Sequence, residues 1–207
     1  MAIEYEVKLC ASRKTMEKIE SCTNIMHWRV ERGCKKHLIS HYFDTDDFKL
    51  LYNNFSYRLR EEGGKKFVHL KANGSFKNGI YIREELEIPL RDAEDFCSKE
   101  FLRKSFPDVF SIVKDAELKE MLVIDTERHI LGLTKKSSLI EGALDFLYFV
   151  RGKRKLEYEE IELELKKGKE EDLIECFSIL QAQYNLKLAG ASKYELGLRS
   201  FGLIPLI

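Results

Sequence analysis

The feature that most constrains this sequence is an alternation of apolar and charged residues that recurs in several separate segments. Residues 3–9 read Ile-Glu-Tyr-Glu-Val-Lys-Leu, and residues 156–166 alternate in the same way. Because alternate side chains of a strand point to opposite faces, each segment predicts a β-strand with one charged and one apolar face. Strands are likewise predicted at 37–44, 55–61, 67–72, 80–88, 117–133 and 138–150, roughly eight in all.

Other segments have helical spacing. Residues 13–22, 46–52 and 169–185 are predicted to form helices that lie outside the strands. A helical insertion is expected around residues 91–117, between two groups of strands. No linker rich in Pro, Gly or Ser divides the chain, so we expect a single domain over residues 1–207.

The overall charge and composition exclude several classes of partner. The chain has 35 Lys plus Arg and 35 Asp plus Glu, a net charge of zero, so neither nucleic acid nor an anionic membrane is an expected partner. No apolar run approaches the ~20 residues of a membrane helix, and the acidic N-terminus is unlike a signal peptide. Five scattered cysteines without a C-x-x-C pair indicate no zinc site and favour a reducing cytoplasm.

The charged faces of the predicted strands carry like charges in close succession. Glu4 and Glu6 share one face, Arg58 and Arg60 share another, and the glutamates of 160–164 share a third. Like charges at this spacing repel unless an opposite charge lies between them. A metal ion can neutralise the carboxylates, and a polyanion can neutralise the arginines. For any one strand alone, a solvated sheet face remains the alternative.

The number of strands suggests how these faces are arranged. A barrel of about eight strands encloses a space for one small ligand. If the charged faces point inward, the apolar faces lie outside and need cover, which the predicted helices can supply. The sequence therefore predicts a mainly β (α+β) fold, a closed antiparallel eight-stranded barrel with a charged lumen and helices packed outside.

The order of these motifs resembles the CYTH superfamily, also called triphosphate tunnel metalloenzymes. Each motif is weak alone, and the match rests on their order over residues 3–199. The resemblance implies an antiparallel tunnel, chemistry on triphosphates, and Mg²⁺ or Mn²⁺ as cofactor, with a layout nearest the bacterial inorganic triphosphatases. The matching segments are Glu4-Tyr5-Glu6-Val7-Lys8, Tyr42-Phe43-Asp44-Thr45, Arg58-Leu59-Arg60 with Lys71, Arg83-Glu84-Glu85-Leu86-Glu87, Glu160 to Leu165, and Ser192-Lys193.

The resemblance and the charge pattern together assign the site residues. Lys8, Arg58 and Glu160 are the expected catalytic residues. The expected substrate-binding cations are Lys8, Arg58, Arg60, Lys71, Arg83, Arg128 and Lys193. The expected metal ligands are Glu4, Glu6, Glu162 and Glu164, with Glu87 and Asp145 as weaker candidates. Many members of the superfamily carry a Lys two positions before Arg128, where this chain has Thr126, so one phosphate contact is missing or is supplied elsewhere.

The expected reaction is metal-dependent hydrolysis of a small polyanion, most simply inorganic tripolyphosphate, with release of orthophosphate. A class IV adenylate cyclase or a thiamine-triphosphatase would use the same tunnel and remains an alternative. A non-catalytic polyphosphate-binding module is disfavoured, because anion binding alone does not need two Glu-rich strands. Gly63-Gly64-Lys65-Lys66 lacks the spacing of a P-loop and is expected to form a hairpin turn, and the five histidines are expected to be structural or solvent-facing.

Overall fold

The computed structural model describes residues 1–91 and 95–205. Among these residues there are ten strands and six helices. The strands are β1 (Ala2–Cys10), β2 (Asn24–Ile25), β3 (Trp28–Asp44), β4 (Ser56–Glu62), β5 (Lys65–Lys77), β6 (Ile80–Pro89), β7 (Lys119–Lys135), β8 (Ser138–Arg151), β9 (Arg154–Lys167) and β10 (Lys187–Leu188). The helices are α1 (Arg13–Ser21), α2 (Lys49–Tyr52), α3 (Lys99–Ser105), α4 (Pro107–Val113), α5 (Glu170–Tyr184) and α6 (Lys193–Ser200).

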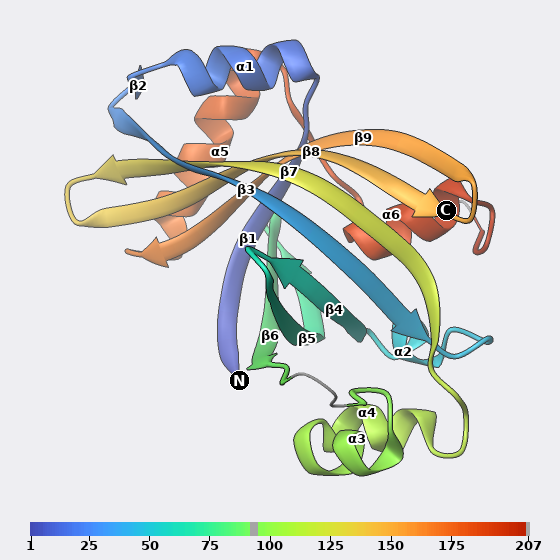
Figure 1. Cartoon of the computed structure of the whole chain (residues 1–207). Coiled ribbons are helices and arrows are strands. Elements are labelled where there is room, and N and C mark those ends of the chain that lie inside the picture. The colour runs from blue at the N-terminus through green and yellow to red at the C-terminus, as the bar shows by residue number, and fades with distance from the viewer. Residues whose placement is uncertain (92–94, 206–207) are drawn as a thin grey trace.

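Eight of the strands form a closed antiparallel barrel (Figure 1). The order around the wall is β1, β6, β5, β4, β3, β7, β8 and β9, and β9 pairs back with β1. This last pairing is a seam between the two ends of the chain, with Glu6 opposite Glu164 and Lys8 opposite Glu162. The short strands β2 and β10 extend the sheet beside β3 and β1. The predicted eight-stranded barrel is confirmed.

The apolar faces of β1 and β9 point outward, where helices cover them. Val7, Leu9 and Leu163 are buried in a core shared with α1 and α5, which lie together against one side of the wall (Figure 1). Ser12 caps the N-terminus of helix α1: its side chain accepts a hydrogen bond from the backbone N–H of Thr15 and so satisfies a free donor of the first turn. Burial of apolar area outside the barrel leaves the charged side chains to the lumen.

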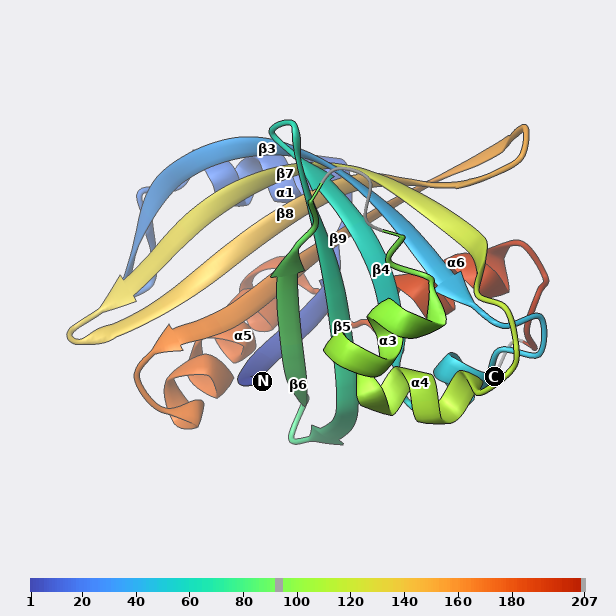
Figure 2. The same cartoon turned by 60° about the horizontal axis from the view of Figure 1, so that its bottom comes forward.

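Two smaller cores cover the rest of the wall. Tyr57, Leu70 and their neighbours on β4 and β5 pack against α2, α3 and α4 (Figure 2). Helix α6 packs on β7 and β8, and Gly197 permits this contact because a Cβ there would overlap the Leu122 side chain. Helices α3 and α4 lie within the insertion expected at residues 91–117, of which residues 92–94 fall outside the described part.

The structure adds three details to the predicted elements. Strand β3 begins at Trp28 rather than at residue 37, and α6 was not predicted. The β4–β5 hairpin turns at Gly63 and Gly64, whose φ angles of 56° and 77° lie in the left-handed region that glycine adopts without strain. None of the described helices has the length and hydropathy needed to cross a membrane.

Candidate active site

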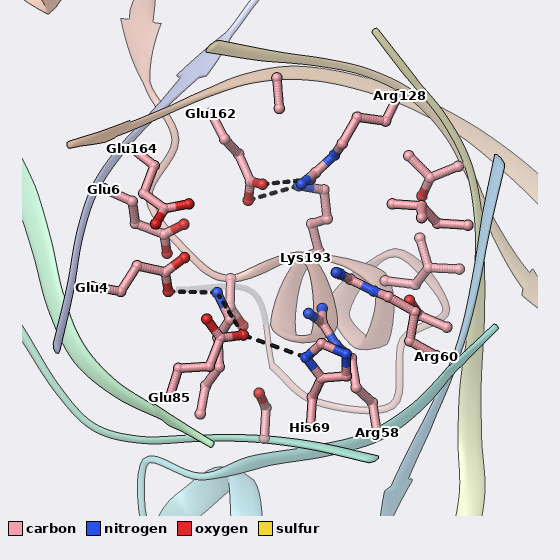
Figure 3. Close-up of a pocket in the computed structure, with 18 of the residues that line it drawn as sticks. Glu4, Glu6, Arg58, Arg60, His69, Glu85, Arg128, Glu162, Glu164 and Lys193 are labelled. Carbon is pink, nitrogen blue, oxygen red and sulfur yellow. Dashed lines mark hydrogen bonds and ion pairs between the residues drawn. The ribbon is translucent and has the colours of Figure 1, made fainter. Parts of the chain in front are cut away.

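The barrel encloses a cavity of about 250 Å³ with charged walls (Figure 3). Of the predicted site residues, all line it except Asp145 and Glu160. Those that line it are Glu4, Glu6, Lys8, Arg58, Arg60, Lys71, Arg83, Glu87, Arg128, Glu162, Glu164 and Lys193. The shared strand face predicted from the alternation therefore does point into a common lumen.

The two signs of charge are segregated across this cavity. Glutamates from β1, β6 and β9 gather on one side, and we call Glu4, Glu6, Glu85, Glu162 and Glu164 the carboxylate wall (Figure 3). Arg58 and Arg60 of β4, which we call the arginine pair, lie across from them (Figure 3). The positions follow from the register, since Arg58 and Arg60 lie opposite Tyr42 and Ser40 of β3, far around the wall from β1.

The carboxylate wall is neutralised by cations of the same strands and their neighbours. Lys71 Nζ lies 2.6 Å from Glu4 Oε2, and Lys8 Nζ lies 3.1 Å from Glu162 Oε1. Arg83 pairs with Glu6, and Lys166 Nζ lies 2.6 Å from Glu164 Oε2. The predicted cations Lys8, Lys71 and Arg83 therefore hold carboxylates in this structure.

The arginine pair has no such partner. Within residues 1–91 and 95–205 neither Arg58 nor Arg60 forms an ion pair with a carboxylate, and the Nε of each, although buried, has no hydrogen-bond partner. Arg58 Nη1 donates instead to the hydroxyl of Tyr42 at 2.8 Å. Burial, together with the like charges of Arg58 and Arg128, lowers the pKa of Arg60 to about 10. The pair, with Arg58 buried and Arg60 partly buried, is thus a cationic site suited to an anion.

A second group of carboxylates surrounds the ammonium group of Lys193. Oxygen atoms of Asp145, Glu160 and Glu162 lie within 4.8 Å of one another, and we call these residues the acid triad. Lys193 Nζ lies 2.8 Å from Asp145 and 2.7 Å from Glu162 and also pairs with Glu160. Arg128 donates two hydrogen bonds to Asp145, at 2.7 and 2.5 Å. Lys193 and Arg128 therefore contact carboxylates here, and Asp145 and Glu160 have no exposed side-chain surface.

The electrostatics differ among the triad members. Burial raises the pKa of Glu160, and the cations around it offset this only in part. For Asp145 burial acts in the same direction, but Arg128 and Lys193 outweigh it and lower the pKa. The pKa of Glu162 is held well below its usual range against burial, first by Lys193 and then by Lys8 and Arg128. The triad is thus stabilised by internal cations.

His69 and Glu85 are among the lumen residues that the sequence analysis did not assign to the site. His69, expected to be structural or solvent-facing, is only 2% exposed and so does not face solvent, and it lines the cavity. Its Nδ1 lies 3.4 Å from Glu85 Oε1, and Glu85 also lines the cavity. Burial and the charges of Arg58 and Arg60 lower the pKa of His69 to about 4, despite Glu85, so the imidazole is neutral at pH 7. The alternation could have found both, because His69 shares a face with Lys71, and Glu85 shares one with Arg83.

The comparisons with known proteins agree with this tunnel of charged residues. Residues 2–196 match the CYTH domain family. The chain belongs to the CYTH family. Its relative in Haemophilus influenzae, an inorganic triphosphatase, is 29% identical over 164 residues. The match covers 77% of this chain but 46% of that protein, so the chain spans less than half of its relative's length.

Solved structures support the CYTH fold. A Hippeastrum protein, described as a candidate adenylyl cyclase with a dominant triphosphatase activity, superposes with a TM-score of 0.65 at 17% identity and covers 98% of both chains. A candidate adenylate cyclase from Bacillus halodurans gives a TM-score of 0.65 at 21% identity and covers 97% of this chain and 99% of its own. At these identities the likeness concerns the fold alone.

One position distinguishes this CYTH chain from the expected motif. Thr126, at the place where the resemblance led us to expect the lysine of many members, lines the cavity and is 5% exposed. Lys36, which lies opposite Arg128 in the β3–β7 register, also lines the cavity. Its Nζ lies 2.8 Å from Glu62 Oε1. A further cation therefore stands on the strand beside the substituted position.

Proposed function

We propose that this protein hydrolyses triphosphates in its tunnel with a divalent metal ion, with inorganic tripolyphosphate as substrate and orthophosphate as product. The observation that carries the proposal is the segregation of charge: the arginine pair, which has no carboxylate partner among the described residues, lies across a cavity of about 250 Å³ from a wall of glutamates. A module that only bound anions would have no use for that wall. The inorganic triphosphatase activity named for the Haemophilus relative supports the same substrate.

We assign Mg²⁺ or Mn²⁺ to the carboxylate wall, which faces the cavity, although among the described residues three carboxylate oxygens lie within 4.8 Å of one another only in the acid triad. Both are hard cations that take carboxylate oxygens. Burial, with the nearby charge of Glu4, raises the pKa of Glu164 despite the pairing with Lys166, so a divalent cation there would relieve an unfavourable charge. We assign Glu4, Glu6, Glu162 and Glu164 as ligands, with Glu87 at the rim. A metal bound there supplies neutralisation of phosphate charge and activation of the attacking water.

The cations of the lumen would bind the triphosphate by exchanging partners. Lys8, Lys71 and Arg83 now neutralise carboxylates. Where Glu4, Glu6 and Glu162 would hold a divalent cation, Lys71, Arg83 and Lys8 would be free to bind phosphate oxygens. Both signs of charge then stay compensated, which avoids the cost of leaving a buried ion unpaired.

Each predicted catalytic residue has a role in this scheme. Arg58 and Arg60 bind phosphate oxygens in the bidentate manner of guanidinium groups, and Lys8 neutralises charge on the reacting phosphate. Glu160 is buried outside the cavity lining, so we assign it to holding Lys193 rather than to water. Positioning and charge neutralisation are the main demands of phosphoryl transfer, and no covalent nucleophile is required.

A phosphate-release assay tests the proposal. Tripolyphosphate, ATP and thiamine triphosphate would each be offered with Mg²⁺, with Mn²⁺ and with EDTA. We expect release of orthophosphate from tripolyphosphate with either metal ion, at a higher rate than from ATP. With EDTA we expect no release. If none of the three substrates released phosphate, the proposal would be contradicted.

We also propose that the enzyme works in a reducing cytoplasm, since its five cysteines are all free.

A specific observation favours organic triphosphates as the second candidate substrate. A less polar cavity of about 530 Å³ adjoins the lumen and shares Ser56, Lys71, Arg83 and Ser192 with it. Its lining includes Phe76 and Tyr81, whose ring centroids are 4.7 Å apart. Aromatic side chains of this kind suit a planar organic ring. A base or thiamine bound there would place its triphosphate in the tunnel.

Product analysis separates the hydrolase from the cyclase. A cyclase must hold the ribose hydroxyl of ATP against the α-phosphorus and releases pyrophosphate, whereas a hydrolase directs water to a terminal phosphorus. With ATP and Mn²⁺ we expect orthophosphate and little cyclic AMP. Cyclic AMP and pyrophosphate in equal amounts would assign the protein as a class IV adenylate cyclase.

A further inference from the structure

Tyr42 is the uncharged residue of the lumen that touches the arginine pair. Strand β3 places it directly opposite Arg58 of β4. Its ring is 3% exposed and stacks on the ring of Tyr194 from α6, with centroids 5.0 Å apart and planes 4° apart. The strand and the helix therefore fix the place of the Tyr42 hydroxyl group between them.

The hydroxyl of Tyr42 has a hydrogen to donate. The oxygen accepts from Arg58 Nη1 at 2.8 Å, so the hydroxyl hydrogen points elsewhere. Within the described part of the chain no acceptor for it is found, and the charges nearest to it are cationic: Arg58, Arg60 and Lys193. Burial opposes them, but these cations lower the pKa of the phenol and make it a stronger donor. An anion in the lumen would be its natural partner.

The same hydrogen bond decides which edge of Arg58 is free. A guanidinium group has five N–H donors, and the edge formed by Nε and one Nη can bind two oxygens of one phosphate. Tyr42 occupies Nη1, while the buried Nε has no partner among the described residues. The edge formed by Nε and Nη2 is therefore available to a ligand.

We propose that Tyr42 positions Arg58 for phosphate binding: it engages Nη1, so that the Nε–Nη2 edge meets one phosphate group of the triphosphate, and its own hydroxyl hydrogen binds that same phosphate group. The inference rests on the proposed function, because the ligand is the triphosphate of the tunnel. It adds a neutral donor, contributed by β3 and supported by α6, to a receptor otherwise made of cations.

The variant Tyr42→Phe tests this role, since it keeps the ring and its stack but removes the hydroxyl. Calorimetric titration with tripolyphosphate, without added divalent metal, should show affinity about tenfold weaker than wild type, the usual effect of a lost hydrogen bond to a charged group. With Mg²⁺ the KM should rise by a similar factor and kcat should change less. Tyr57→Phe is the matched control, because Tyr57 precedes Arg58 and its hydroxyl donates to the Phe96 carbonyl outside the barrel. The control should bind as wild type does.

A double-mutant cycle shows whether Tyr42 acts through Arg58. Arg58→Lys removes the two-donor edge, so adding Tyr42→Phe to it should weaken affinity by less than about threefold. Wild-type affinity in Tyr42→Phe, or an equal loss in both backgrounds, would overturn the proposal. Because binding is measured without turnover, these outcomes differ from failure of the hydrolase proposal, which would show as binding without release of phosphate.

Discussion

The carboxylate wall and the acid triad are two groups of glutamate and aspartate in one barrel, and they differ in what neutralises them. The wall lines the cavity and is paired with four separate cations, Lys8, Lys71, Arg83 and Lys166, whereas the triad shares Lys193 and Arg128, which line the cavity too. The triad surrounds the ammonium group of Lys193, and two of its members do not line the cavity. Glu162 belongs to both groups.

The difference teaches that closeness of carboxylates is insufficient to define a metal site. In the triad an internal ammonium already lies among the oxygens, so a metal would have to displace a buried side chain. On the wall the cations can move to a bound phosphate. We therefore expect the wall to hold the metal and the triad to hold Lys193 in place.

The largest effect is expected from the wall. Glu6→Gln should lower turnover of tripolyphosphate by about 10³- to 10⁴-fold at saturating Mg²⁺, because several kcal/mol of charge stabilisation depend on the metal. Glu84 lies on the neighbouring strand, accepts a hydrogen bond from Asn73 and does not line the cavity. The control variant Glu84→Gln should therefore have turnover near that of wild type. If Glu160→Gln stays folded and loses as much turnover as Glu6→Gln, the triad is the metal site and the comparison fails.

The triad should instead control stability. Lys193→Met leaves Asp145 and Glu160 buried without their ammonium partner, and breaking a buried pair in this way costs about 3–5 kcal/mol in the free energy of unfolding. Urea unfolding measures this free energy, and the double variant Lys193→Met, Glu160→Gln should recover part of the lost stability. Lys187→Met, at an exposed position of β10, is the control. An unchanged midpoint in Lys193→Met would show that the triad needs no internal cation.

The arginine pair should respond differently from both carboxylate groups. Arg60→Ala should lower kcat/KM for tripolyphosphate by about 100-fold, since phosphate contacts serve both ground and transition states. Raising the substrate concentration should recover part of its rate, whereas raising Mg²⁺ should not. Arg29→Ala, exposed on β3, is the control. Wild-type kinetics in Arg60→Ala would mean that the pair only balances lumen charge.

The smallest expected effect concerns His69, which lies between the wall and the arginine pair. Its pKa is lowered to about 4 in the folded protein, so below pH 6.5 the unfolded chain takes up a proton that the folded chain does not. The free energy of unfolding should therefore decrease as the pH is lowered, and His69 should account for about 2 kcal/mol of this decrease between pH 7.5 and pH 5. His69→Gln should lose correspondingly less over that range in urea unfolding. Parallel curves for the two proteins would show that the arginine pair does not depress the pKa of His69.

Much of the barrel could be predicted because alternation reports directly on which side of a strand is buried. The same rule placed Glu4, Glu6, Arg58 and Arg60 in one lumen. It could not place the start of β3, because residues 31–37 pair with β7 but expose most of their polar side chains and so lack an apolar face.

The partners of the site residues were less predictable. That Lys193 lies within the acid triad depends on α6 packing across β7 and β8, a tertiary contact with no local sequence signal. Likewise, that Arg58 has no carboxylate partner in the described part of the chain follows from the position of β4 relative to β1 around the barrel. The face on which a side chain lies is a local property of its strand, whereas its ion-pair partner depends on how the barrel closes.

The β1–β9 seam has a consequence for how the protein is made. Translation delivers Glu4 and Glu6 before β8 and Glu162 and Glu164 only after it, so the carboxylate wall cannot assemble before β9 has been made. Until the last long strand arrives, the charged faces remain hydrated, and the repulsion among them is weak in water. Closing the seam is a long-range, entropically costly pairing and should be a late event in folding. Until β9 has been made, a nascent chain therefore lacks the complete carboxylate wall.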